Sequence, residues 1–209
     1  MASRLARLAQ GAPVRETPAA AVAVEQCDMC AVPVGPGHRH VVDLTDRRIM
    51  CVCRACALLF DSKDAGGGRR RLLPTRRRRL DAFVLDAAQW DRLRIPVDMA
   101  FFFRSTQAGR VVALYPSPAG ATESLLELEA WTELETANPE LATIEPDVEA
   151  LLVSRARDMR EHWIVPIDDC YELVGVIRSR WRGFGGGEEV WAAIHGFFDD
   201  LPTREETRW

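Results

Sequence analysis

Paired apolar runs separated by short polar turns recur along the chain. Three such pairs occur, at 38–44 with 48–53, 97–104 with 110–115, and 148–154 with 162–166. Runs of this length around a polar or glycine-containing turn are typical of antiparallel hairpins. The second pair is followed by Pro-Ser-Pro-Ala-Gly at 116–120, which predicts the end of its second strand because proline has no backbone donor.

Helical spacing of apolar residues replaces this pattern in four other segments. It predicts helices over 85–93 and 128–137, and two more near the C-terminus that are separated by the glycine-rich segment 183–187. Asp169 and Glu172 match a reciprocal capping pattern at the start of the first C-terminal helix. The apolar face of that helix carries Tyr171, Val174, Ile177 and Trp181. The second presents Val190, Trp191, Ile194, Phe197, Phe198 and Leu201.

The composition is that of a globular protein. Of 209 residues, 47% are hydrophobic and 28% are charged, near the usual values of about 45–50% and 25%. No stretch approaches the roughly 20 apolar residues of a membrane-spanning helix, so we do not expect membrane insertion. The first residues show no secretory-signal pattern, and we expect a cytoplasmic protein.

Charge divides the chain into two unlike parts. Residues 1–80 hold 15 basic and 7 acidic residues, a net charge of +8, whereas residues 81–209 hold 12 and 24, a net charge of −12. Such a contrast indicates two parts with different surfaces. Together with the patterns above, it predicts four segments: a flexible arm at 1–22, a cysteine-containing module at 23–62, a Gly/Arg-rich linker at 63–80, and an α+β domain at 81–209.

Four of the six cysteines form two C-x-x-C pairs. Cys27 and Cys30 are followed, after 22 residues, by Cys53 and Cys56. Each C-x-x-C turn places two thiolates on one side of a tight loop, and two such knuckles close a four-sulfur site. Zn²⁺ is the expected ion because zinc favours tetrahedral sulfur and nitrogen ligands, and iron is the alternative because four thiolates also hold iron. A module of about 40 residues has too small a core to fold alone, and bound metal would stabilise it.

The fold class expected from these features is α+β. It comprises a small N-terminal zinc-ribbon-like module followed by an α+β domain with antiparallel hairpins and two C-terminal helices. Cys51, His38 and His40 are three further potential ligands, beyond the four that a tetrahedral ion needs. On regular strands Cys51 shares a face with Cys53, and His38 with His40. The three could be ordinary strand residues, one histidine could replace a cysteine, or the surplus could form an exchangeable metal site.

Two arginine runs, Arg69–Arg71 and Arg76–Arg79, lie in the predicted linker. A basic run beside a zinc ribbon is a common arrangement in nucleic-acid-binding proteins. The predicted strands of the module lack the aromatic residues that stack on bases, however, and the chain as a whole is acidic. A solvated linker or contact with an acidic partner is therefore the favoured interpretation. No group of residues forms a catalytic constellation, which favours a non-enzymatic protein.

Several segments together resemble an uncharacterised bacterial family, a domain of unknown function encoded beside high-affinity uptake [NiFe]-hydrogenase genes. They are the C-x-x-C module with 37–44, and the segments 95–103, 115–124, 146–153 and 170–175. The resemblance implies a gene context and little chemistry, because the family has no established activity. Together with the cysteine pairs and the lack of a catalytic constellation, it leads us to expect a non-enzymatic, zinc-binding accessory protein that supports hydrogenase assembly or function by contacting hydrogenase subunits or maturation factors. We expect its partner-binding residues to include Tyr115, Pro116, Ser117, Arg76 and Arg77. The alternatives are a nucleic-acid-binding regulator that uses the zinc ribbon and 69–79, and an iron–thiolate electron-transfer protein.

Overall fold

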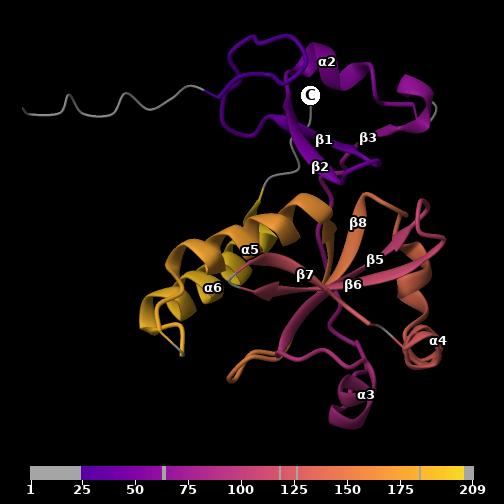
Figure 1. The fold of residues 1–209 in the computed structure, drawn as a ribbon, viewed down its shortest axis with the longest axis vertical. Helices are drawn as coiled ribbons and strands as arrows, with labels where there is room; N and C mark the ends of the chain where they lie inside the picture. The colour runs from indigo at the N-terminus through magenta and orange to yellow at the C-terminus, as the bar shows by residue number, and fades with distance from the viewer. Residues whose placement is uncertain (1–24, 63–64, 118, 126, 184, 205–209) are drawn as a thin grey trace, which may run out of the picture.

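The computed structural model describes residues 25–62, 65–117, 119–125, 127–183 and 185–204. Figure 1 shows a small sheet with a short helix at one end of the molecule and a larger sheet flanked by helices at the other. The predicted α+β fold class is confirmed, with antiparallel sheets, two C-terminal helices and an N-terminal cysteine cluster. The arm predicted at 1–22 lies outside the described residues.

The small sheet is built around the first predicted hairpin. Strands β1 (Arg39–Asp43) and β2 (Arg48–Val52) pair antiparallel, with His40 opposite Cys51. The short helix α2 (Arg54–Leu58) follows β2 directly. The other edge of β1 pairs with β3 (Arg70–Leu72), which follows the 3₁₀ turn η1 (Ala65–Gly68).

The segment 63–80 is not the unpaired linker that its glycines and arginines predict. It contains β3, which completes the small sheet, and β4 (Arg78–Arg79), which pairs with β9 of the large sheet. Between these strands Leu73 is 1% exposed and packs in the same core cluster as Val42 and Phe101. The like charges do not keep this segment extended in solvent, because several of its arginines, Arg71, Arg76, Arg77 and Arg79, form ion pairs with carboxylates of the acidic domain. The small sheet is thereby packed against the larger domain.

The large sheet has six antiparallel strands in the order β4-β9-β8-β5-β6-β7. Its remaining strands are β5 (Met99–Ser105), β6 (Arg110–Ser117), β7 (Gly120–Ser124), β8 (Glu149–Ser154) and β9 (Glu161–Pro166). The β5–β6 and β8–β9 hairpins confirm the two predicted pairs of runs. Strand β7 was not predicted, because Pro116 indicated the end of β6. Pro116 is tolerated because it lies beyond the residues of β6 that pair with β5, where only β7 is a neighbour.

Helices cover both faces of this sheet (Figure 1). One face is covered by α3 (Ala87–Arg92), α4 (Leu128–Ala137) and the 3₁₀ turn η2 (Pro139–Thr143). The other face is covered by α5 (Ile167–Arg180), α6 (Glu188–Asp200) and the 3₁₀ turn η3 (Leu201–Thr203). Strand alternation divides the core between them. Phe101 and Phe103 pack in the cluster that contains the α5 and α6 side chains. Phe102 points the other way and meets Trp90 of α3 and Trp131 of α4.

The start of α5 differs from the predicted capping pattern. The helix begins at Ile167, so Asp169 lies inside the first turn rather than at the cap. Its side chain is 3% exposed and accepts hydrogen bonds from Arg77 at 2.6 and 2.9 Å and from Arg204 at 3.0 Å. The carboxylate of Asp169 therefore binds two guanidinium groups instead of capping the helix. Both come from residues distant in the sequence, so the local capping pattern could not predict them.

Candidate metal centre

The first cysteine knuckle is a tight turn at 27–30. The amide of Cys27 donates to the carbonyl of Val32 at 2.9 Å, and the amide of Ala31 donates to the carbonyl of Cys27 at 2.8 Å. Ala31 has φ +60°, the left-handed conformation that lets the chain reverse after the second cysteine. These bonds bring the two side chains of the C-x-x-C pair to the same side of the loop.

The second knuckle forms where β2 passes into α2. Cys53 is the N-cap residue of α2 in an extended conformation, and the amide of Ala57 donates to its carbonyl at 2.9 Å. Asp28 joins the two knuckles: its amide donates to the carbonyl of Cys51 at 2.8 Å, and its carboxylate accepts from the amide of Cys51 at 2.6 Å. The hairpin thus carries Cys53 and Cys56 back to the first pair.

The four sulfur atoms of Cys27, Cys30, Cys53 and Cys56 all lie within 4.8 Å of one another. The Sγ atoms of Cys30 and Cys53 are 3.7 Å apart, close to the edge of about 3.8 Å for a sulfur tetrahedron around zinc at about 2.3 Å. Cys27 and Cys56 are buried, Cys53 is half-buried and Cys30 is exposed. The four thiols can hold one metal ion.

The electrostatics of this thiol cluster favour a cation. Burial alone would raise the pKa of Cys27, but backbone amides of Cys53, Met29 and Cys30 outweigh it and lower the pKa to about 6. Burial and then the neighbouring thiol side chains raise the pKa of Cys56 to about 12. The cluster therefore holds one thiolate readily at neutral pH and resists further negative charge. A divalent ion would remove this resistance, because a coordinated thiol is deprotonated.

The cysteines form much of the local core. The buried residues packed together here are Cys27, Val34, Val41, Met50, Val52, Cys56, Ala57 and Phe60. This cluster is small, and two of its members would be metal ligands. Structural zinc typically contributes an apparent folding free energy of about 10–16 kcal/mol in small modules, which is comparable to the whole burial energy of so few apolar side chains at about 1.5–3 kcal/mol each.

The surplus donors form a separate group. His38, His40 and Cys51 have ligand atoms within 4.8 Å of one another and are all half-buried. The expectation that Cys51 shares a face with Cys53 does not hold, because β2 ends at Val52 and the chain turns into α2. Cys53 belongs to the four-cysteine group, whereas Cys51 faces the two histidines.

The arginines of 69–79 are engaged with carboxylates. Arg77 pairs with Asp169, and Arg76 pairs through two nitrogens with Glu149, whose side chain is 0% exposed. Arg71 and Arg79 each make an ion pair through one nitrogen, at 2.6 Å with Glu145 and at 3.2 Å with Glu161. Several guanidinium groups of the arginine runs therefore face the protein instead of presenting a continuous basic surface to phosphates.

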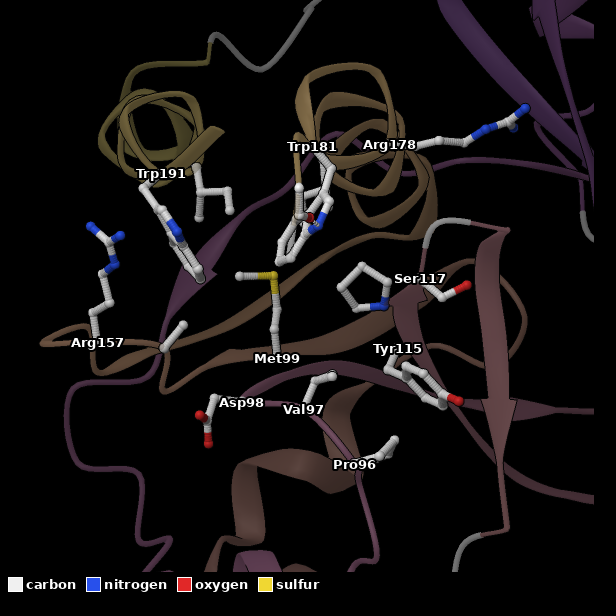
Figure 2. Close-up of a pocket in the computed structure, with 15 residues that line it drawn as sticks. Pro96, Val97, Asp98, Met99, Tyr115, Ser117, Arg157, Arg178, Trp181 and Trp191 are labelled. Carbon is white, nitrogen blue, oxygen red and sulfur yellow. Dashed lines mark hydrogen bonds between the residues drawn. The ribbon is translucent and has the colours of Figure 1, made fainter. Parts of the chain in front are cut away.

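Tyr115, Pro116 and Ser117, the other expected partner-binding residues, line a pocket of about 870 Å³. Figure 2 shows Met99, Trp181 and Trp191 pointing into it from β5, the end of α5 and α6, with Tyr115 on the opposite side. The two indole rings are 6.2 Å apart at their centroids, and the guanidinium carbon of Arg157 lies 4.6 Å from the ring of Trp191. The sequence indicated the two tryptophans only as core positions; their helical spacing was a signal for burial, not for a pocket.

One family model matches residues 26–205 of this chain, and its description is a family of unknown function, DUF5947. No curated protein and no solved structure matches. Within the described residues, no helix has both the length and the apolar character needed to cross a membrane.

Proposed function

The chain belongs to the DUF5947 family, whose function is unknown, and we propose that it is a non-enzymatic, zinc-binding accessory protein that acts by contacting a protein partner. The observation that carries this proposal is the convergence of four cysteine sulfurs from two knuckles within 4.8 Å. A closed set of four protein ligands suits a structural ion, because a catalytic ion needs an open position for substrate or water.

Zinc is the proposed ion. Its preference for four thiolates in a tetrahedron matches the 3.7 Å separation of the Cys30 and Cys53 sulfurs. An iron–thiolate centre has the same donor set and would point to electron transfer instead. The two ions are separated directly by elemental analysis, and iron would also colour the protein.

The proposed docking site is the pocket lined by Tyr115, Met99, Trp181 and Trp191. Aromatic and aliphatic walls suit an apolar segment of a protein partner, since such side chains dominate the centres of protein interfaces. The resemblance to the hydrogenase-linked bacterial family suggests hydrogenase subunits or maturation factors as that partner.

A nucleic-acid-binding role has less support. Phosphate binding relies on free Lys and Arg side chains, and Arg71, Arg76, Arg77 and Arg79 are paired with carboxylates. A partner would have to compete with these internal ion pairs, one of which joins Arg76 to a fully buried glutamate.

The first test measures metal content and thermal stability of protein purified without chelator. We expect about one tightly bound zinc ion in the four-cysteine site, lost together with a folded N-terminal module in Cys27→Ser and Cys56→Ser. Cys170→Ala is the matched control, because Cys170 is a buried thiol of the large core outside the cluster. Unchanged zinc content and stability in both serine variants would refute the ligand assignment.

The second test captures partners from the native host. Hydrogenase subunits or maturation factors are expected to co-purify with the wild type and to be lost in Tyr115→Ala. Leu125→Ala is the control, since Leu125 is a solvent-exposed apolar residue that does not line the pocket. Recovery of nucleic acid alone would reject the accessory role in favour of the regulator.

A further inference from the structure

His38, His40 and Cys51 converge on the face of the β1–β2 hairpin that meets the large domain. His40 and Cys51 are directly opposite one another in the antiparallel register, and such partners have neighbouring side chains. His38 lies two residues before His40, which places it on the same face. Val42, the next residue on this face, packs in the core of the large domain. The three donors therefore lie at the junction between the small sheet and that domain.

Both imidazole rings are oriented through their Nδ1 atoms. Nδ1 of His40 lies 2.7 Å from Oδ2 of Asp168, and Nδ1 of His38 lies 3.0 Å from the carbonyl oxygen of Gly35. A carbonyl oxygen and an ionised carboxylate are acceptors, so each Nδ1 is the protonated, donating nitrogen. In the neutral rings each Nε2 then carries a lone pair.

The two Nε2 atoms face each other at 3.1 Å. Two lone pairs at this distance repel unless a proton or a metal ion lies between them. The separation is close to the edge of about 3.3 Å for two imidazole nitrogens on a tetrahedral zinc ion with bonds of about 2.0–2.1 Å. The Cys51 sulfur completes a donor set within 4.8 Å.

We propose that His38, His40 and Cys51 form a second metal site that binds a late first-row divalent transition ion such as Zn²⁺. Two imidazoles and one thiolate suit these ions and not Mg²⁺ or Ca²⁺, which select oxygen ligands. Three protein ligands leave a fourth position open for water or for a donor from a partner. His38 and His40 also line a cavity of about 330 Å³, which provides a route to the ion.

Asp168 is the positioning residue of this site. Its carboxylate fixes the tautomer and the ring orientation of His40, as carboxylates do for metal-bound histidines in many proteins. It comes from α5 of the large domain, 128 residues away along the chain. An ion held here would tie the small sheet to that domain, whereas an ion in the four-cysteine site would bind only residues of the small module.

The test is a Zn²⁺ titration of the full chain by equilibrium dialysis with elemental analysis. We expect about two zinc ions per wild-type chain, one tight and one weaker and exchangeable, and about one in His38→Gln, His40→Gln and Cys51→Ser. The exposed His195→Gln is the matched control and should keep both. Asp168→Ala should weaken the second ion by about 10–100-fold and leave the first unchanged.

The zinc content of the variants distinguishes the second metal site from the four-cysteine site. Loss of only the tight ion in Cys56→Ser and only the weaker ion in His40→Gln supports two independent sites. A single ion in the wild type that the histidine and Cys51 variants retain overturns the second site while leaving the four-cysteine site intact. A single ion lost in both Cys56→Ser and His40→Gln overturns it as well, because it indicates one mixed site. Substitution with Co²⁺ provides a second readout, since thiolate-to-cobalt absorption increases with the number of thiolate ligands. The four-cysteine site should therefore absorb more strongly than the site with the single thiolate of Cys51.

Discussion

The ion pair between Arg76 and Glu149 offers a sharp test of how the arginine run is used. Glu149 begins β8 with its side chain 0% exposed, and it accepts from Arg76 Nε and, at 2.7 Å, from Nη2. A third bond, at 2.9 Å, comes from the backbone amide of Glu145. Arg76→Gln removes the positive charge and leaves the buried carboxylate with only neutral partners.

The expected cost follows from the burial of the two partners. Breaking a buried ion pair by removing one charge typically costs about 3–5 kcal/mol. The Arg76 side chain is 53% exposed, so water can replace part of the lost interaction, which places the expected loss near 3 kcal/mol. For a domain of this size that corresponds to a melting temperature lower by roughly 6–12 °C.

The assay is denaturant and thermal unfolding with zinc present at saturation. Arg78→Gln is the matched control, because Arg78 is exposed and donates only to Thr143 Oγ1 among the described residues, so its change should stay within about 0.5 kcal/mol. The double variant Arg76→Gln/Glu149→Gln should lose less than the sum of the two single variants. Equal, small effects of Arg76→Gln and Arg78→Gln would refute the stabilising role of the Arg76–Glu149 ion pair and revive the solvent-exposed basic run.

Two further predictions concern the large domain. Burial, together with Arg155, Arg160 and Arg79, lowers the pKa of His162 to about 4, below about 6.5 in the unfolded chain. As the pH falls, the unfolded chain therefore binds this proton before the folded chain does, and the free energy of unfolding should decline from about pH 6.5 towards pH 4. His162→Gln should reduce this decline when unfolding is measured as a function of pH. An unchanged pH dependence would contradict the reasoning. Gly186→Ala should destabilise the protein by about 1–3 kcal/mol, because φ is +80° and a Cβ atom would lie 2.8 Å from Val190 Cγ1. Gly185→Ala is its control, because an added Cβ there would have no atom of the described residues beyond its chain neighbours within 4 Å. Equal thermal shifts of the two variants would contradict the prediction.

Elements with strong local patterns were predictable. The β5–β6 and β8–β9 hairpins and the helices α4 and α6 follow apolar runs or helical stripes that each segment carries by itself. The strands β3, β4 and β7 were missed because they are short, rich in arginine, or begin next to a proline-rich turn. Their strand conformation depends on pairing with distant partners and on carboxylates that neutralise the arginine charges.

By itself, the sequence determined the two C-x-x-C knuckles and the two strand runs that form the β1–β2 hairpin, since both depend on spacings of a few residues and on the period of a strand. Only the tertiary structure decided which donors belong together. It placed Cys53 with the four sulfurs, left Cys51 with the histidines, and brought Asp168 to His40 across 128 residues. It also engaged Arg76 and Arg77 of the arginine run in ion pairs, because the buried carboxylates that bind them come from β8 and α5. Contacts of this kind arise when separate elements share one core, and no local pattern specifies them.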